Sequence, residues 1–311
     1  MPAPWAAGLA VAFARWHGEH SAIADLATGT GADAASACVR ALGEMAENLS
    51  LGAGSHPQPV PAIGRDGRVI VADARMLIPA GIADPGSEGV AAGETIAEAK
   101  IAALQERIER AALALWWGGR LPARLVSLPA PMLEQYRQGQ TQRRSMLWHL
   151  PLMHSVTICL VLTDDGDGGR IAMGTAAHTD PHRAADAALR EALQAEIAWL
   201  APPHHPDVAH RDALHHALRS RLPVLVGASR IEVDRRGDDN PLPQVEAELA
   251  SKGLDWGFAD LTAANIGVPV VRCVIPGWPL ARPILMSPTR ADDAAVTQPL
   301  SSFAYATADG G

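Results

Sequence analysis

The sequence predicts a mixed α/β (α+β) fold, in which short strands alternate with glutamate-bearing helices. Two patterns indicate this class. Apolar runs of strand length are bounded by Gly and Pro, and alanine-rich segments between them carry helical spacing. The chain has 311 residues, of which 48% are hydrophobic and 19% charged, so it can bury a sizeable core. We expect a single domain built from related halves, roughly 1–150 and 151–311.

The first half contains the clearer helices. The second of them starts after a small-residue loop and ends in a Trp-Trp-Gly-Gly stretch. The expected elements are a strand over 8–14, a turn at Gly29-Thr30-Gly31, a helix over about 33–49, a strand over 68–72, a loop over 87–94 and a helix over about 95–117.

The second half repeats this order of elements. Residues 164–169 are rich in turn formers and predict a hairpin loop, and Pro181 suits the first turn of a helix. The expected elements are hairpin strands over 154–163 and 170–173, a helix over about 181–199, a mobile connection over 201–216 that enters another helix, and buried strands over 223–227 and 268–275, the last turning at Pro276-Gly277.

One pattern occurs in three of these helices: Leu-x-Glu-x-x-Glu or Leu-x-Glu-x-x-Gln, at 42–47, 104–109 and 189–194. Residues three apart share a helix face. If the three faces converge, their carboxylates repel one another unless a cation neutralises them, and Mg²⁺ prefers oxygen ligands and often binds together with nucleotide phosphates. The predicted metal ligands are Glu44, Glu47, Glu106, Glu109 and Glu191, with Gln194 as a neutral hydrogen-bonding partner.

The alternative is that each segment is a solvated helix face supported by local ion pairs. Any one copy alone favours that interpretation. Three copies favour convergence, and their uneven separation along the chain argues against a solenoid repeat and for duplicated modules within one domain.

Composition excludes several classes of function. The formal net charge of −8 argues against a broad nucleic-acid surface. No run of about 18 apolar residues indicates a membrane span, and the N-terminus lacks the basic start of a secretion signal, which together predict a cytoplasmic protein. Cys38, Cys159 and Cys273 lie in apolar surroundings and are expected to be core residues rather than disulfide partners or zinc ligands.

Two polar clusters invite metal-site hypotheses that we do not favour. The histidines of the 201–216 region lack a second cluster or a cysteine, so a polar loop and helix face is the better interpretation. These are His204, His205, His210, His215 and His216. The acidic loop Asp164, Asp165 and Asp167 lacks the closing Glu of a calcium loop and is better explained as a hairpin turn.

Four segments resemble the motifs of the YcaO family, in the family's order. Residues 29–50 resemble its first nucleotide motif, approximately GKG followed by SALxEAxERYS. Residues 87–117, SEGVAAGETIAEAKIAALQERIERAALALWW, resemble the second, approximately SNGxAAGxTxEEAxxxAxxELIERDAxALWW. Residues 174–194 resemble the third segment, and 267–278, GVPVVRCVIPGW, resemble the late GIPVVRVxVPG strand. The four matches run over most of the chain and are specific in combination.

The resemblance implies a fold in which the glutamate-bearing helices surround ATP and Mg²⁺, and an enzyme that modifies peptide backbones. In the family, a nucleophile adds to an amide carbonyl, the oxygen takes the γ-phosphoryl group of ATP, and phosphate leaves. A Cys, Ser or Thr side chain as nucleophile gives an azoline ring, which the Trp116–Arg120 stretch favours here. The alternatives are thioamidation with a sulfur-transfer partner and a degenerate, noncatalytic scaffold subunit.

The resemblance also assigns residues to the nucleotide. Ser87, Gly89, Arg110 and Gln194 are expected contacts by their position in the motifs, Arg110 either neutralising a phosphate or orienting a Glu. Arg282 or Arg290 is a weaker candidate for a late phosphate clamp.

Several motif positions depart from the family pattern. Thr30 replaces Lys, Arg40 replaces Ser, Asn48 replaces Arg and Glu88 replaces Asn. Each change affects a polar contact expected near the nucleotide, so either the affinity for ATP is lower than in the family or other residues supply these contacts. Arg40, one helical turn before Glu44, can supply the positive charge that is missing at Thr30.

The expected partners also follow from the resemblance. The substrate is a precursor peptide. The short stretch before Gly29 and the C-terminus without a proline-rich end contain no fused leader-binding or E1-like domain, so we expect such a partner protein to deliver the peptide. Trp5, Trp16 and Trp278 make a protein interface, including a homodimer, possible, with core packing as the alternative.

Overall fold

The computed structural model describes residues 2–3, 5–16, 26–52, 58–74, 87–200, 208–226, 230–231 and 242–281. The predictions at His204, His205, Arg282 and Arg290 lie outside these residues. Within them, no helix combines the length and the apolar character needed to cross a membrane.

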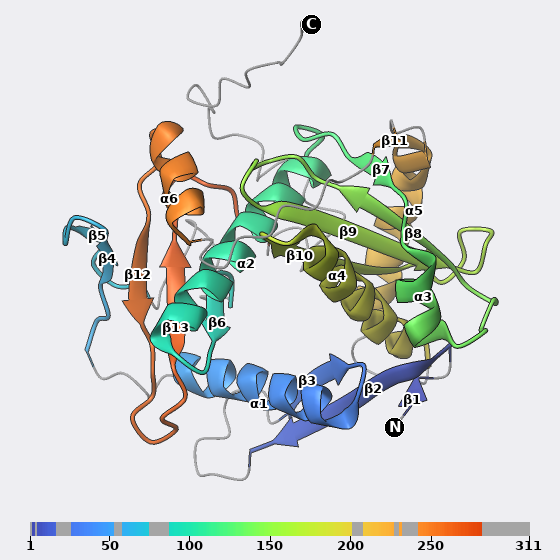
Figure 1. Cartoon of the computed structure of the whole chain (residues 1–311), viewed down its shortest axis with the longest axis horizontal. Helices are drawn as coiled ribbons and strands as arrows, with labels where there is room; N and C mark the ends of the chain where they lie inside the picture. The colour runs from blue at the N-terminus through green and yellow to red at the C-terminus, as the bar shows by residue number, and fades with distance from the viewer. Residues whose placement is uncertain are drawn as a thin grey trace, which may run out of the picture.

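The described strands form three sheets (Figure 1). The N-terminal sheet is antiparallel, with β1 (Pro2–Ala3), β2 (Ala6–Arg15) and β3 (Leu26–Gly31) in that order. The second has the order β10-β9-β8-β7-β11 and is antiparallel except for the β11–β7 pair. Its strands are β7 (Arg124–Val126), β8 (Arg144–His149), β9 (Thr157–Asp164), β10 (Ala172–His178) and β11 (Arg230–Ile231).

The third sheet is antiparallel throughout, with the order β5-β4-β12-β13-β6. Its strands are β4 (Ala62–Gly64), β5 (Val69–Val71), β6 (Val90–Ala92), β12 (Gly257–Asp260) and β13 (Val270–Val274). The described helices are α1 (Ala34–Leu51), α2 (Ile96–Trp117), α3 (Ala130–Arg137), α4 (Pro181–Glu196), α5 (Val208–Val226) and α6 (Leu242–Ser251), and a 3₁₀ turn, Ile197–Leu200, follows α4.

Each of the three glutamate-bearing helices begins at a side-chain cap. Asp33 accepts a hydrogen bond from the backbone N–H of Ser36 at the start of α1, and Thr95 accepts from Glu98 at the start of α2. Asp180 caps α4, and Pro181 occupies its first position. The predicted starts of all three helices are therefore confirmed to within one residue.

Two glycines let helices pack directly on strands. A Cβ at Gly29 in β3 would overlap the backbone of α1 at Ala37 and Ala41, and a Cβ at Gly174 in β10 would overlap the backbone of α4 at Ala188 and Ala192. The absence of a side chain at these two positions sets how closely α1 and α4 approach their sheets.

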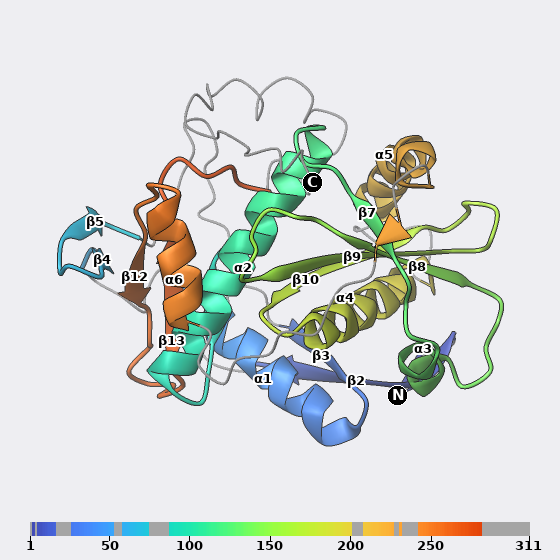
Figure 2. The same cartoon turned by 45° about the horizontal axis from the view of Figure 1, so that its top comes forward.

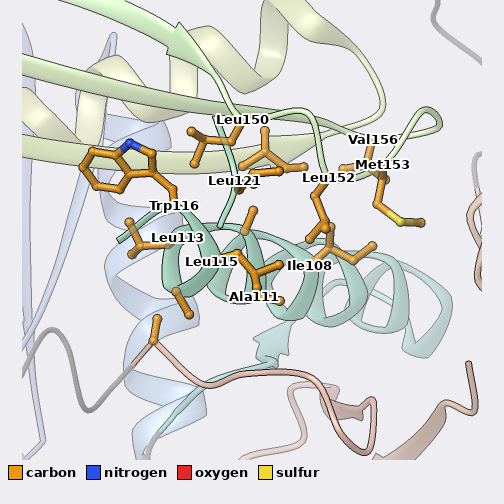
Figure 3. Close-up of a cluster of buried hydrophobic side chains, with 14 of the residues drawn as sticks. Ile108, Ala111, Leu113, Leu115, Trp116, Leu121, Leu150, Leu152, Met153 and Val156 are labelled. Atoms are coloured by element: carbon orange, nitrogen blue, oxygen red, sulfur yellow. The ribbon is translucent and has the colours of Figure 1, made fainter. Parts of the chain in front are cut away.

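Helix α2 runs between the second and third sheets and contacts β6, β13 and β10 (Figures 1 and 2). Ile108, Ala111 and Leu115 are at most 1% exposed and belong to the largest described hydrophobic cluster, into which Leu150 and Leu152 from the β8–β9 connection also pack (Figure 3). Since α2 is buried along most of its length, the polar side chains that it carries inside the protein require a specific explanation.

Most predicted elements are confirmed, including the hairpin of β9 and β10 across the Asp-rich loop and the turn at Pro276-Gly277. Four local predictions are wrong. The predicted mobile connection over 201–216 is helix α5 from Val208 onward, and its residues 201–207 lie outside the described ones. The predicted turn at 29–31 is the end of β3, the predicted loop over 87–94 contains β6, and the predicted strand over 223–227 lies in α5 as far as Val226. A short apolar run does not by itself distinguish a buried strand from a buried helix turn. Here Leu225 is buried, and its carbonyl accepts a hydrogen bond from the indole of Trp148.

The cysteine and tryptophan predictions are confirmed in part. Cys159 and Cys273 are buried, but Cys38 is exposed on α1, and all three are free thiols. Trp278 is buried and belongs to the largest described hydrophobic cluster, so core packing explains it. Trp5 lies against the guanidinium groups of Arg143 and Arg170.

Candidate functional site

The glutamates of α1, α2 and α4 converge, as the repeated pattern predicts. The negative charges of Glu44, Glu47 and Glu109 all act on Glu106, and the charge of Glu109 acts on Glu191. We call these five residues the acidic cluster. Three helices that are far apart in the sequence therefore direct their carboxylates toward one region of the protein, where their charges interact.

Arg110 on α2 places a positive charge among the glutamates of the acidic cluster. Its guanidinium lies 3.2 Å from Glu109 Oε1 and 3.6 Å from Glu106 Oε1. Burial lowers the pKa of Arg110, but the negative charges of Glu109, Glu106 and Glu191 outweigh this effect and raise it. Arg110 therefore stays charged, and one guanidinium faces several carboxylates.

Backbone and hydroxyl donors hold the individual carboxylates. Thr175 on β10 bridges two helices, since its hydroxyl donates to Glu109 Oε1 at 2.7 Å and its backbone N–H donates to Glu191 Oε2 at 2.9 Å. The backbone N–H of Ala92 on β6 donates to Glu47 Oε1 at 2.8 Å. The strands next to the helices thus fix the orientation of these side chains.

Burial and mutual repulsion both disfavour the charged forms of the glutamates in the acidic cluster. Burial and then the charge of Glu44 raise the pKa of Glu47 to about 8. Burial and then the charge of Glu109 raise the pKa of Glu191 to about 7. For Glu106, burial raises the pKa well above its ordinary value, although Arg110 opposes this. A divalent cation would offset both the loss of hydration and the repulsion that raise these pKa values.

The acidic cluster is partly open to solvent. As whole residues Glu44 and Glu191 are exposed, Glu47 and Glu106 are half-buried, and Glu109 is buried; the burial that raises the pKa of Glu191 concerns its carboxyl group, which accepts from Thr175. No three Asp, Glu, His or Cys side chains in the described ranges lie close enough to hold one metal ion as they stand. The glutamates can still influence one another's pKa values, because charge interactions extend further than metal–ligand bonds. Without a metal ion, their mutual repulsion also favours larger separations. Carboxylate oxygens are the donor set that Mg²⁺ prefers, so the residues present suit that ion.

The other predicted nucleotide contacts lie around this cluster. Gln194 on α4 donates from Nε2 to Thr28 Oγ1 on β3 at 2.7 Å. Arg40 on α1 is subject to the charges of Arg190 and Asp186, but no interaction with Glu44 contributes to its pKa shift. Both residues therefore lie where α1 and α4 flank β3.

Ser87 and Gly89 precede and begin the turn into β6. Ser87 is exposed and its carbonyl accepts a hydrogen bond from the N–H of Val90. Gly89 is buried at φ 71°, and a Cβ there would come within 2.6 Å of the Cys273 carbonyl oxygen. The positive φ and the close approach to Cys273 therefore explain a glycine at position 89 without any contact to a nucleotide. Glu88, between them, is buried, and its negative charge is one of those that raise the pKa of Arg110.

Sequence reasoning missed three residues of this region: Thr28, Thr175 and Arg190. Thr175 follows Gly174 directly within the third motif segment, and that position is the sequence signal that could have identified it. The structure does not support a metal site at the histidines of the 201–216 region or at the acidic loop. His215 Nδ1 accepts a hydrogen bond from the N–H of Ile171, and the acidic loop closes through the hydrogen bond from Asp165 N–H to the Gly169 carbonyl.

Residues 71–279 match the family model described as YcaO cyclodehydratase, ATP- and Mg²⁺-binding. The match covers more than half of the chain, and the protein belongs to the YcaO family. The resemblance seen in the sequence motifs is thereby confirmed, together with ATP and Mg²⁺ as the family's cofactors. Glu106, Glu109 and Glu191 lie within the matched residues, whereas Glu44 and Glu47 precede them.

Solved structures share the fold. The YcaO protein from Methanopyrus kandleri, bound with AMPPCP and Mg²⁺, is 19% identical with a TM-score of 0.68, and the match covers 91% of this chain and 86% of that one. The E. coli microcin synthetase McbBCD complex contains a chain that is 14% identical with a TM-score of 0.60, covering 86% of this chain and 88% of that one.

A heterocyclase in complex with substrate and cofactor is 22% identical with a TM-score of 0.58 over 71% of this chain. The present chain spans about a third of that protein, since the match covers 33% of its length. No curated protein sequence matches the chain.

Proposed function

We propose that this protein uses ATP and Mg²⁺ to activate peptide backbone amides, and that it forms azoline rings from Cys, Ser or Thr residues of a ribosomally made precursor peptide. The observation that carries the proposal is the acidic cluster on α1, α2 and α4 in a chain of the YcaO family. The family description, a cyclodehydratase, favours azoline formation over thioamidation.

In this proposal the five glutamates hold the metal ions, which, when bound, neutralise charge on the nucleotide phosphates. Arg110 orients Glu106 and Glu109 through its contacts at 3.6 and 3.2 Å. Thr175 orients Glu109 and Glu191 and so keeps α2 and α4 in register across the site. Phosphoryl transfer depends chiefly on positioning and charge stabilisation, so no nucleophilic triad is required of the protein.

The proposed ring formation needs no reactant other than the peptide and ATP. The side chain of the peptide adds to the amide carbonyl, and the resulting oxyanion takes the γ-phosphoryl group, which converts ATP to ADP. Loss of phosphate then carries away the former amide oxygen and leaves a C=N bond in the ring. The peptide loses the elements of one water molecule for each ring.

We further propose that a partner protein, E1-like or leader-binding, presents the peptide. The McbBCD neighbour is a complex, which is consistent with such an arrangement. A pull-down with the precursor peptide, with and without the candidate partner, tests this step.

The decisive experiment is mass spectrometry of a Cys/Ser/Thr-containing precursor peptide incubated with the protein, its partner, ATP and Mg²⁺. We expect a loss of about 18 Da for each ring, the mass of one water. Glu106→Gln should abolish the product, and Glu134→Gln, at an exposed position on α3, is the matched control. A gain of about 16 Da in the presence of a sulfur donor would show thioamidation instead. Unmodified peptide together with no ATP binding would indicate a scaffold subunit.

A further inference from the structure

Two side chains of the second motif are charged where the YcaO pattern has uncharged residues. Glu88 replaces the Asn of the pattern, and Arg107 stands where the pattern has Leu. Both residues are buried, with 8% and 2% of their surfaces exposed. A buried charge is costly unless hydrogen bonds and an opposite charge compensate it, so each of these side chains needs partners inside the protein.

Both side chains bind the short segment that follows β13. Arg107 on α2 donates from Nη2 to the Trp278 carbonyl at 2.9 Å and from Nη1 to the Pro279 carbonyl at 3.0 Å. Glu88 accepts at Oε2 from the backbone N–H of Ala281 at 3.2 Å. Hydrogen bonds with a charged donor or acceptor are stronger than neutral ones. One guanidinium and one carboxylate therefore hold the backbone at three of four consecutive residues.

The same two residues adjoin the candidate site. Glu88 lies between Ser87 and Gly89, the predicted nucleotide contacts, and Arg107 directly follows Glu106, a predicted metal ligand. The negative charge of Glu106 also acts on Arg107. Glu88 and Arg107, which we call the buried pair, thus bind the chain after β13 through their side chains and adjoin the candidate site through their backbones.

Strand β13 holds the loop that carries Glu88. The backbone N–H of Cys273 donates to the Gly89 carbonyl at 2.7 Å, and Arg272 Nε donates to the Glu88 carbonyl at 3.4 Å. Residues 278–281 follow β13 after a single turn. A displacement of the loop therefore also affects β13 and the segment after it.

The two charges of the buried pair stabilise each other. Burial lowers the pKa of Arg107, and the negative charge of Glu88 opposes this effect. Removing one of the two charges leaves the other with less compensation, whereas removing both leaves no buried charge at these positions. The pair should therefore act as a unit, which a double variant can reveal.

We propose that Glu88 and Arg107 are positioning residues that link the order of residues 278–281 to occupation of the nucleotide site. This inference rests on the proposed function and deepens it. A nucleotide held by the loop around Glu88, with a metal ion on Glu106, restrains the loop and the helix turn that carry the buried pair. The pair passes this restraint to the segment. The linkage is reciprocal, so an ordered segment strengthens nucleotide binding by the factor by which the nucleotide stabilises the segment.

The test measures hydrogen exchange of the Ala281 amide by NMR, with and without Mg²⁺ and a non-hydrolysable ATP analogue, and the affinity for the analogue by calorimetry. In the wild type the analogue should slow this exchange about fivefold or more, the lower end of typical coupling between two sites. Glu88→Gln combined with Arg107→Met removes both charges at similar volume, and the introduced glutamine can still accept from Ala281. In this double variant the slowing should fall below about twofold and the affinity should drop about fivefold. Glu94→Gln, at an exposed position of the same motif, is the matched control and should keep both.

The single variant separates stability from positioning. Arg107→Met leaves Glu88 buried with less compensation, so it should melt below the double variant, whereas both variants should lose the protection of Ala281. Equal slowing in the wild type and the double variant, or no slowing in a wild type that binds the analogue, would overturn the link. If the wild type binds no nucleotide, the proposed function fails, and exchange without nucleotide then decides whether the buried pair orders the segment. Faster exchange of Ala281 in the double variant would support that role, and equal exchange would refute it.

Discussion

Replacing Glu109 with Gln separates the effect of charge from the effect of shape in the acidic cluster. The Glu109 side chain is 8% exposed, accepts a hydrogen bond from the Thr175 hydroxyl at 2.7 Å and forms an ion pair with Arg110 at 3.2 Å. Gln has the same size and can still accept from the Thr175 hydroxyl. The metal-free variant loses part of the ion pair with Arg110 but also a charge that repels Glu106 and Glu191. We therefore expect its free energy of unfolding to stay within about 1 kcal/mol of the wild type.

The nucleotide-bound state should respond very differently. At a ligand concentration of a hundred times Kd, Mg–ATP stabilises the wild type by about 2.7 kcal/mol. This corresponds to a rise in Tm of about 5 °C for a chain of this size. If loss of one charged metal ligand raises Kd about a hundredfold, the remaining stabilisation is about 0.4 kcal/mol, or less than about 1 °C.

The assay is thermal unfolding with and without Mg–ATP, followed by calorimetric titration. Glu134→Gln removes an equivalent charge from an exposed position on α3 and should keep the full shift. A Glu109→Gln variant that shows wild-type circular dichroism and also the full Mg–ATP shift would refute the metal assignment.

Three further outcomes are expected. The raised pKa values of Glu47 and Glu191, about 8 and 7, mean that the folded protein holds protons which the unfolded chain has lost. This stabilisation is full below about pH 4.5 and is lost as the pH rises through 7 and 8. Melting of the metal-free protein between pH 5 and 9 should show the decline, and Glu47→Gln should reduce it; an increase in Tm over that range contradicts the assignment. Gly174→Ala should lower the free energy of unfolding in urea by about 1–3 kcal/mol, because the methyl group would overlap the backbone of α4. Gly43→Ala, whose nearest contact for the added Cβ is 3.8 Å, should instead stabilise α1 by about 0.5–1 kcal/mol, and equal effects of the two changes would show that the close approach is unimportant. Thr175→Val should weaken Mg–ATP binding about tenfold in calorimetry, and unchanged affinity would show that its hydroxyl does not orient the site.

The sequence was sufficient to predict the elements whose boundaries are set by neighbouring residues. Asp33, Thr95 and Asp180 cap helices at the predicted starts, because capping is a local hydrogen bond between residues two or three positions apart. The run at 223–226 shows the limit of such signals. Its apolar residues suit a buried strand, but Leu225 packs against the central core as part of α5, and that packing decides the conformation.

The candidate site also has one part that the sequence predicted and one part that depends on tertiary packing. The i, i+3 spacing identified the faces of α1, α2 and α4 that carry the glutamates, because helix periodicity alone fixes which side chains share a face. It did not identify Thr175 or the environment of Arg40, since both depend on a strand that packs beside a helix distant in the sequence.

The amino-acid sequence by itself determined the helices, most of the strands, the family motifs and the residues that bear charge. Only the tertiary structure decided which groups from different helices come together: Thr175 on β10 holds Glu109 of α2 and Glu191 of α4, and the charge of Arg190, not of Glu44, contributes to the pKa shift of Arg40. The physical reason is that periodicity acts over a few residues, whereas electrostatic coupling depends on distances in space. Those distances are set by the close approach of α1 and α4 to their strands at Gly29 and Gly174.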